Sequence, residues 1–115
     1  MAASLIDLEI FDELQQTAGA DFVVELLEAF FGEAPENLAA MRTALAARAS
    51  EPFRRAAHSL KANAQTFGAT ALGAAALALE HDELPHDTAP LDALDNLYTE
   101  TITTLREMAR DLRQA

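Results

Sequence analysis

A regular pattern of mostly apolar side chains runs through the last part of the chain. From residue 91 onward they recur every three or four positions, at Leu91, Leu94, Tyr98, Thr101, Leu105, Met108 and Leu112. This spacing puts them on one face of an α-helix. Acidic residues come early in the segment and arginines late, as the helix dipole favours. Because such a helix must bury its apolar face against other elements, the segment predicts a packed helical domain.

A short amphipathic helix is expected near the N-terminus. Asp7 is suited to cap its first turn, and Gly19 is suited to end it. Between them, one helical face carries Leu8, Phe11 and Leu14. We expect this helix to cover one end of the domain.

A long helix is expected over residues 21–48. Asp21 is its expected cap, and its first half has a wide apolar stripe made of Phe22, Val23, Leu26, Leu27 and Phe30. Pro35 interrupts this pattern, which resumes at Leu38, Met41 and Leu45. Proline deletes one backbone hydrogen bond and crowds the preceding turn, so we expect one helix bent near residues 33–35. Two separate helices are the alternative.

Two shorter helices follow and are predicted to form a hairpin. Pro52 suits the first turn of the earlier one, whose buried side carries Phe53, Ala57, Leu60, Ala64 and Phe67. Gly68 ends it, and Thr70 is a candidate cap for the next helix, which buries Leu72, Ala76 and Leu79. So short a connection makes the two helices antiparallel neighbours. The polar segment 81–90, with two prolines, is predicted to be a loop.

The predicted fold class is all-α: an up-and-down four-helix bundle with a short N-terminal cap helix. A chain of 115 residues is long enough for one core, so residues 1–115 are expected to form a single domain. Half of the residues are hydrophobic but only 6% are aromatic, and alanine is abundant, which favours closely packed helices. The sequence has no strand pattern, glycine-rich nucleotide loop or internal repeat.

Composition excludes several classes of function. The formal net charge of -11 argues against binding nucleic acid, whose phosphates this surface would repel. With no cysteine, the chain has no disulfide framework, which agrees with a reducing cytoplasm. Its longest weakly apolar run, residues 69–79, is shorter than the about 20 residues that a membrane span needs. We therefore expect a cytoplasmic protein without membrane contact.

A histidine is predicted to face solvent on the helix before Gly68. Its face of the helix carries Arg54, His58, Lys61, Ala62 and Gln65. The window from Arg54 to Leu79 contains no Asp or Glu, and Lys61 is the only lysine in the chain. Nearby cations favour a neutral, nucleophilic imidazole and an anionic group transferred to it, such as a phosphoryl group. Taken alone, His58 is also compatible with an ordinary surface histidine.

Other polar residues of this helix have less specific predictions. Lys61 lies one turn from His58, close enough for its ammonium to reach a phosphate on the ring. Gln65 is a candidate hydrogen-bond donor to that phosphate or to a partner, with a neutral surface residue as the alternative. Of Arg54 and Arg55, we expect one to attract an acidic partner and the other to pair with a nearby carboxylate.

Two further features are predicted to be structural. Asn63 lies at the edge of the buried side, where a hydrogen bond between helices is expected. His81 and His86 bracket acidic residues, but their segment lacks a fixed helical spacing, so solvated loop histidines are favoured over a metal site. No metal site is predicted.

The stretch HSLKANAQTFGA, preceded by RRAA, resembles the core of histidine-containing phosphotransfer (HPt) domains. The family pattern is His-x-x-Lys, a small residue, and Gly ten residues after the His, and the likeness extends weakly over most of the chain. The resemblance implies that His58 accepts and donates phosphate and that Lys61 helps to hold it. Ala62 stands where the family often has Gly. The expected partner-binding residues are Arg54, Arg55, Ala62 and Gly68.

The resemblance also implies a phosphorelay protein without kinase activity or a cofactor of its own. Its partners would be response-regulator receiver domains, which carry phosphoaspartate and Mg²⁺, and a hybrid histidine kinase, in a bacterial cell. One alternative is a non-catalytic helical adaptor. Another is a phosphotransfer domain excised from a chemotaxis-type or hybrid histidine kinase, although a start at Met1 favours a free-standing protein. We expect a monomer, because the apolar stripe of the last helix is used within the bundle.

Overall fold

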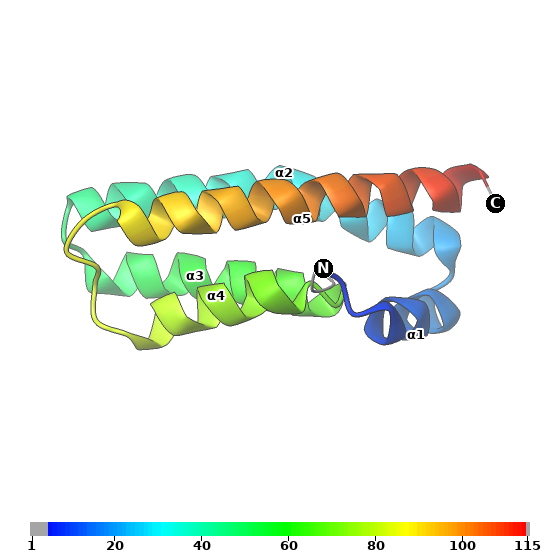
Figure 1. Cartoon of the computed structure of the whole chain (residues 1–115), viewed down its shortest axis with the longest axis horizontal. Helices are drawn as coiled ribbons and strands as arrows, with labels where there is room; N and C mark the ends of the chain where they lie inside the picture. The colour runs from blue at the N-terminus through cyan, green and yellow to red at the C-terminus, as the bar shows by residue number, and fades with distance from the viewer. Residues whose placement is uncertain (1–4, 115) are drawn as a thin grey trace.

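The computed structural model describes residues 5–114, which form five helices and no strand. The helices are α1 (Leu8–Ala18), α2 (Ala20–Ala46), α3 (Ser50–Thr66), α4 (Thr70–His81) and α5 (Ala89–Gln114). Helices α2 to α5 run side by side and alternate in direction, and α1 lies at one end (Figure 1). The predicted all-α class, a four-helix bundle with an N-terminal cap helix, is confirmed.

Each helix of the bundle packs on two neighbours. Helix α3 lies between α2 and α4, and α5 lies between α4 and α2. Within residues 5–114, no Cα atom of α2 lies within 8 Å of one in α4, and none of α3 within 8 Å of one in α5, so these pairs occupy opposite corners and meet only through core side chains. Helix α4 packs far more extensively on α3 than on α5. The α3–α4 hairpin predicted from the short connection is therefore the tightest unit of the fold.

The core is built from the faces that the helical spacing predicts. Its largest fully buried side chains include Phe30, Phe53, Leu27, Met41, Leu60, Leu72, Leu91, Leu94 and Leu105. The Phe30 ring lies 5.5 Å from that of Phe67 and 6.5 Å from that of Tyr98, centroid to centroid, in tilted arrangements that aromatic pairs favour. Thr101 is also buried, and its hydroxyl donates a 2.8 Å hydrogen bond to the Leu97 carbonyl. Burial of this polar side chain therefore leaves no unsatisfied donor.

Helix α2 is continuous through Pro35, so the alternative of two helices is wrong. Its ends differ from the prediction. Gly19, with φ 89°, precedes its first residue and offers no side-chain cap, and Asp21 lies inside the first turn instead of capping it. Thr70 is likewise the first residue of α4 and not its cap. Asp7 does cap α1, because its carboxylate accepts a 3.0 Å hydrogen bond from the Glu9 amide.

Two hydrophobic side chains expected in the core are exposed. Leu8 is 59% exposed and Phe22 is 50% exposed. On α1 the buried position is taken by Phe11, and on the first turns of α2 by Val23 and Leu27. The helical surfaces that carry Leu8 and Phe22 are not covered by another described element, so the periodic pattern overstated how much of each helix is buried.

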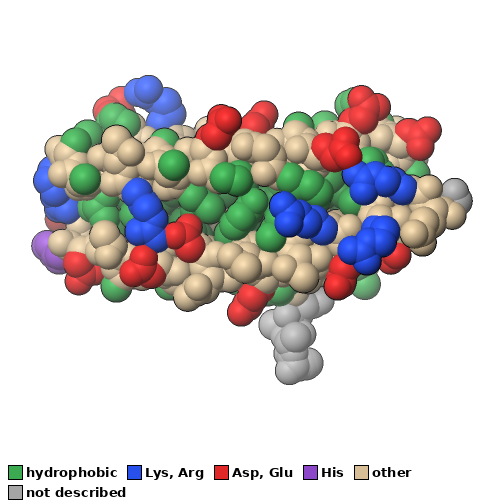
Figure 2. Space-filling view, turned by 90° about the horizontal axis from the view of Figure 1, so that it is seen from above, with side chains coloured by type: hydrophobic (Ala, Val, Ile, Leu, Met, Phe, Trp, Pro, Cys, Tyr) green, Lys and Arg blue, Asp and Glu red, His purple; other side chains and the backbone are tan. Residues whose placement is uncertain are grey.

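The seam between α2 and α5 is closed by ion pairs over apolar side chains. Figure 2, which views this side of the molecule, shows hydrophobic side chains along its middle, with basic and acidic side chains lying across and beside them. Arg42 of α2 pairs with Asp92 at 2.8 Å and also with Asp95, both on α5. Arg113 pairs with Glu28 near the other end of the seam. Since these pairs are largely exposed, they contribute to the pairing of α2 with α5 less than the apolar contacts beneath them do.

The segment before α1 is fastened to the turn between α3 and α4. Gly68 adopts φ 76°, in the left-handed region that favours glycine, and ends α3 as predicted. Its carbonyl accepts a 2.7 Å hydrogen bond from the Asp7 amide. A Cβ on Gly68 would lie 2.6 Å from the Asp7 carbonyl oxygen. Ile6 is buried next to this contact, so the N-terminal segment and the hairpin turn form one packed unit.

Candidate functional site

Helix α3 presents His58 to solvent because its other side is fully used by the core. The five residues predicted on its buried side are all buried, namely Phe53, Ala57, Leu60, Ala64 and Phe67. The His58 side chain is 58% exposed. The predicted exposure of the imidazole is therefore what the structure has.

The α3–α4 hairpin brings a carboxylate to this histidine. His58 lies eleven residues before Ala69 in the turn, and Glu80 lies eleven residues after it, so antiparallel packing sets them opposite each other. His58 Nδ1 is 2.9 Å from Glu80 Oε2. The other carboxylate oxygen, Oε1, lies 3.4 Å from Lys61 Nζ, at ion-pair distance. One glutamate thus holds both residues of the predicted reactive pair.

Small residues allow this close approach of α4 to α3. Gly73 of α4 is buried, and a Cβ there would lie 3.3 Å from Gln65 Cγ and 3.9 Å from the Lys61 carbonyl oxygen. The side chain of Glu80 is only 20% exposed, so its carboxylate sits at the helix interface and not in bulk water. This position makes its charge state important for both partners.

Electrostatics keep this carboxylate ionised. Burial tends to raise the pKa of Glu80, but the hydrogen bond from His58 and the ammonium of Lys61 together outweigh that effect, and the pKa lies below its ordinary value. An ionised carboxylate only accepts hydrogen bonds, so Nδ1 carries the proton that it donates to Glu80. In the neutral ring, Nε2 then holds the lone pair. No hydrogen bond to Nε2 occurs within residues 5–114, and the nucleophilic atom of the imidazole is unobstructed.

Lys61 differs from its predicted setting. Its side chain is 17% exposed and lies against Glu80, whereas we expected a solvent-facing ammonium in an acid-free environment. The window from Arg54 to Leu79 lacks acids along the sequence, but α4 contributes Glu80 and α2 contributes Glu33 and Glu36. A linear window cannot report carboxylates that neighbouring helices supply.

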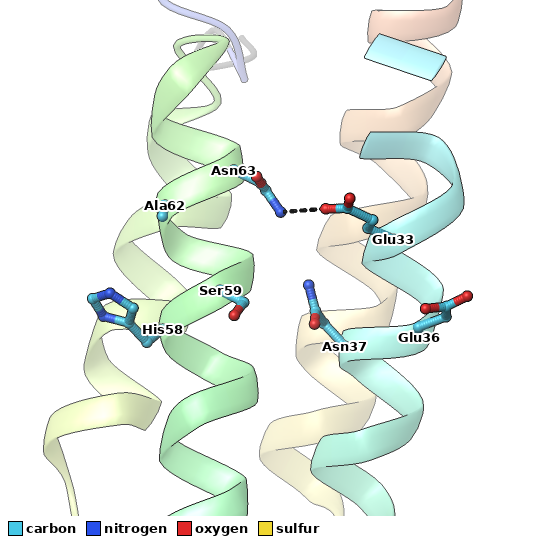
Figure 3. A pocket seen from close by; sticks show the side chains of 7 residues that line it. All are labelled: Glu33, Glu36, Asn37, His58, Ser59, Ala62 and Asn63. Carbon is cyan, nitrogen blue, oxygen red and sulfur yellow. Dashed lines mark hydrogen bonds between the residues drawn. The ribbon is translucent and has the colours of Figure 1, made fainter. Parts of the chain in front are cut away.

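A polar groove lies between α2 and α3 on the other side of His58. We call it the α2–α3 groove; it has a volume of about 520 Å³ and is lined by Glu33, Glu36, Asn37, His58, Ser59, Ala62 and Asn63. Asn63 Nδ2 donates a 3.3 Å hydrogen bond to Glu33 Oε1, which confirms the predicted bond between helices. Figure 3 shows that the imidazole stands at the edge of this groove and points away from α2.

The remaining predicted residues fall at different places around α3. Arg55 is 3.7 Å from Glu51, one turn earlier, so it is the arginine that pairs with a nearby carboxylate. Arg54 is exposed and has no ion pair within the described residues. Ala62 and Gln65 are exposed on the His58 side. Gly68 is buried beneath the segment before α1, so it does not lie on the partner-facing surface where we expected it.

The sequence reasoning missed Glu80, although a signal for it was present. Once α3 and α4 are predicted to be an antiparallel hairpin that turns near Ala69, the residue opposite His58 follows from equal spacing on both sides of the turn. Glu80 is also the first acidic residue after the acid-free window. The hairpin register and the end of the acid-free window together predict a carboxylate beside His58.

Residues 5–114 contain neither a cluster of metal ligands nor a membrane-spanning helix. There, no group of three or more His, Asp or Glu side chains is arranged to hold a metal ion. His81 and His86 are both exposed, at the end of α4 and in the following loop. None of the helices that the structure describes is both long enough and apolar enough to cross a membrane.

Comparison with protein families agrees with this geometry. The model of the Hpt domain family matches residues 25–115, which include most of α2 and all of α3, α4 and α5. The chain belongs to the Hpt domain family. Hpt domains carry phosphoryl groups on histidine in phosphorelays and are not kinases, and they interact with receiver domains and histidine kinases. Searches of curated proteins and of solved structures gave no significant match.

Proposed function

We propose that His58 of this Hpt domain accepts a phosphoryl group from the phosphoaspartate of a receiver domain and passes it to another receiver domain. The observation that carries this proposal is the contact of His58 Nδ1 with Glu80, at 2.9 Å, on a ring that is otherwise open to solvent. That contact leaves Nε2 as the free nucleophile. It also supplies a negative charge next to the ring that is to be phosphorylated.

The transfer step follows from these positions. The lone pair of Nε2 attacks phosphorus, a new N–P bond forms, and the bond from phosphorus to the aspartyl oxygen breaks with its electron pair leaving on the aspartate. The proton on Nδ1 stays in place, so the phosphorylated ring is a cation that the Glu80 carboxylate stabilises. The reverse step returns the phosphoryl group to an aspartate through the same geometry.

Lys61 is proposed to stabilise the phosphoryl oxygens. Its ammonium lies 3.4 Å from Glu80 and one helical turn from His58, so a small movement takes it from the carboxylate towards the phosphate. Gln65, exposed on the same side, is proposed to donate a hydrogen bond to the phosphate or to the partner. We assign the Mg²⁺ needed to offset charge on the phosphoryl group to the receiver domain, where the phosphoaspartate is bound.

The partner is proposed to dock over α3. Arg54 and Ala62 are exposed there, and the small side chain of Ala62 leaves room for close approach. We infer that the upstream partner is a hybrid histidine kinase and that the protein works as a single domain and a monomer in the bacterial cytoplasm. The net charge of -11 supports the monomer, because identical acidic surfaces repel each other.

A labelling experiment tests this function. The protein is incubated with a panel of phosphorylated receiver domains in the presence of Mg²⁺, and acid-labile phosphate is followed with time. Wild type is expected to become labelled and His58→Gln to stay unlabelled. Labelled His58→Gln would refute the site, and a wild type that binds a receiver without taking its phosphate would favour a non-catalytic adaptor.

Lys61→Ala tests the role of the ammonium. Lys61 lies at the α3–α4 interface and is not one of the buried hydrophobic side chains of the core, so the variant is expected to keep the fold. It is expected to transfer phosphate about tenfold more slowly, the scale of one lost charge-assisted hydrogen bond. Lys61→Arg, which keeps the charge, serves as the matched control and is expected to retain more of the rate. An unchanged rate in Lys61→Ala would remove the role assigned to this side chain.

A further inference from the structure

Helices α4 and α5 leave an apolar groove between them. We call it the α4–α5 groove; it has a volume of about 280 Å³ and is lined by Ala75, Ala78, Leu79, Pro90, Ala93, Leu94 and Leu97. No hydrogen bond or ion pair joins α4 to α5 within residues 5–114, whereas Arg42 joins α5 to α2 on the other side of the bundle. The α4–α5 groove is therefore an apolar seam that the bundle itself does not close.

An uncharged strip of α4 connects this groove to His58. Leu79 lines the groove, and the next residue, Glu80, holds His58 Nδ1. Leu77 is 37% exposed one turn before Glu80, and the exposed Ala78 lies on the groove. Helix α4 has no charged side chain before Glu80. Because a helix with its side chains is about 10 Å across, the groove lies about one helix width from the imidazole.

The opposite side of His58 is polar. The α2–α3 groove carries Glu33, Glu36, Asn37, Ser59 and Asn63. The imidazole points away from that groove (Figure 3). Protein interfaces have an apolar centre that is depleted of charge and a polar rim. A partner that reaches His58 therefore finds apolar surface on the α4 side and rim-like surface on the α2 side.

The charge around the α4–α5 groove indicates the chemistry of its occupant. From Ala62 to Leu105 the chain has no lysine or arginine but seven acidic residues. Three of them are engaged elsewhere, since Glu80 contacts α3 and Asp92 and Asp95 pair with Arg42 of α2. The other four are exposed and form no ion pair within residues 5–114; they are Asp82, Glu83 and Asp87 between α4 and α5, and Glu100 on α5. Among the described residues, the one cation that reaches this connection is Arg48, which donates a 2.6 Å hydrogen bond to the Pro85 carbonyl. A second copy of this chain would bring like charges together, which is unfavourable. A partner with basic side chains beside an apolar one is complementary to this surface.

We propose that the α4–α5 groove receives an apolar side chain, flanked by lysine or arginine, of the same receiver domain that exchanges phosphate with His58. This inference rests on the proposed function. A specific interface covers about 800 Å² of each partner, a patch about 30 Å across. A receiver seated over His58 on the α4 side thus extends across α4 to the groove. Filling the groove displaces water from apolar surface, which stabilises the complex.

Substitutions at Ala78 test this docking surface. Ala78→Lys and Ala78→Glu both fill the groove, with opposite charges, at an exposed helical position that tolerates either residue. The matched control is Ala39→Lys. Ala39 is an exposed alanine of α2, the helix diagonally opposite α4, and it lines a groove between α2 and α5. Two rates are measured for each protein: transfer from a phosphorylated receiver domain, and direct labelling of His58 by phosphoramidate.

The expected result separates docking from chemistry. Ala78→Lys lowers transfer from the receiver at least about tenfold, the loss typical of a disturbed interface hot spot. Ala78→Glu loses less, since its charge suits a basic partner, and Ala39→Lys matches wild type. Phosphoramidate labels all four proteins at the same rate, because this small donor does not need the groove.

Each other outcome contradicts the proposal. Wild-type transfer rates in both Ala78 variants would overturn the groove as a docking site while leaving the proposed function in place. Equal losses in Ala78→Lys and Ala78→Glu would overturn the basic flank. A wild-type dimer in sedimentation that Ala78→Lys dissociates would assign the groove to a second copy. Failure of every receiver to label wild type would refute the proposed function, and this docking mode with it.

Discussion

Glu80 is the residue that orients the His58 ring and fixes its tautomer. Its two carboxylate oxygens contact different cation-forming groups, Nδ1 of His58 at 2.9 Å and Nζ of Lys61 at 3.4 Å. The first contact determines which ring nitrogen carries the proton. The second holds an ammonium one helical turn from the ring that is proposed to accept the phosphoryl group. A single side chain on α4 therefore prepares two side chains on α3.

Replacing this carboxylate by an amide tests its effect on the histidine. Glu80→Gln keeps the shape and one hydrogen bond but loses the charge that is proposed to stabilise the phosphorylated ring. We expect phosphotransfer to slow by about tenfold to a hundredfold, by analogy with the loss of a carboxylate that orients a metal-bound imidazole. Nitrogen NMR of the imidazole is expected to show a smaller fraction of the form with the proton on Nδ1.

Glu36→Gln is the matched control for that variant. Glu36 is an exposed glutamate of the α2–α3 groove with no hydrogen bond to His58, so the same loss of charge there is expected to leave the tautomer unchanged. If Glu80→Gln kept both the wild-type rate and the wild-type NMR signals, Glu80 would have no positioning role.

The lowered pKa of Glu80 also predicts how stability depends on pH. The folded protein binds this proton less readily than the unfolded chain, whose glutamate titrates near the ordinary value of 4.5. The carboxylate thus contributes stability that is fully present above that value and is lost as pH falls through the lower folded-state pKa. Urea unfolding from pH 7 to 3 is expected to show the advantage of wild type over Glu80→Gln shrinking over this acid range.

At the scale of the elements, helical spacing predicts the buried faces well and the ends poorly. The residues predicted on the buried side of α3 and at its end are all buried, because helical period and burial agree along the whole helix. They are Phe53, Ala57, Leu60, Ala64 and Phe67. The predicted start of α2 was wrong. Gly19 both ends α1 and immediately precedes α2, so Asp21 falls inside the first turn and cannot cap the helix. Capping depends on the backbone path between helices, which periodicity does not contain.

The packing of helices against one another decides the remaining features that the sequence did not predict. The exposure of Leu8 and Phe22 depends on which helical surfaces find a neighbour, and the burial of Lys61 depends on a carboxylate from α4. Both features depend on tertiary contacts, which helical spacing within one segment does not determine. The contact between His58 and Glu80 is an intermediate case, because hairpin register was enough to predict it once the turn was located.

Two glycines provide a test of the hairpin turn. Gly68 has φ 76°, and a Cβ there would meet the Asp7 carbonyl oxygen at 2.6 Å, so Gly68→Ala is expected to lower the free energy of unfolding by about 1–3 kcal/mol. Gly32 lies inside α2 with open space around its Cβ position, so Gly32→Ala is expected to raise it by about 0.5–1 kcal/mol. Urea denaturation measures both. Equal effects in the two variants would contradict the strained turn.

For the whole molecule, charge is distributed unevenly with respect to the reactive site. The chain carries 19 acidic and 8 basic residues, and the segment from Ala62 to Leu105 has no lysine or arginine. On α3, Arg54 and Arg55 lie within a turn of His58, whereas α4 and α2 contribute the carboxylates around it. A partner approaching from solvent therefore meets a mainly negative field, with a small basic area on the helix that carries His58.

This field predicts the salt dependence of phosphotransfer. A receiver with basic side chains around its phosphoaspartate is attracted over long range, and that attraction is screened as the Debye length falls from about 30 Å at 0.01 M salt to about 3 Å at 1 M. The second-order rate constant for transfer is expected to fall steeply over this range, while the rate at saturating receiver changes little. Labelling by phosphoramidate, a small donor, should show much weaker salt dependence. A second-order constant that does not change with salt would mean that charge does not guide the encounter, and one that rises with salt would mean that the two surfaces repel each other. Either result would show that the basic flank assigned to the partner is wrong.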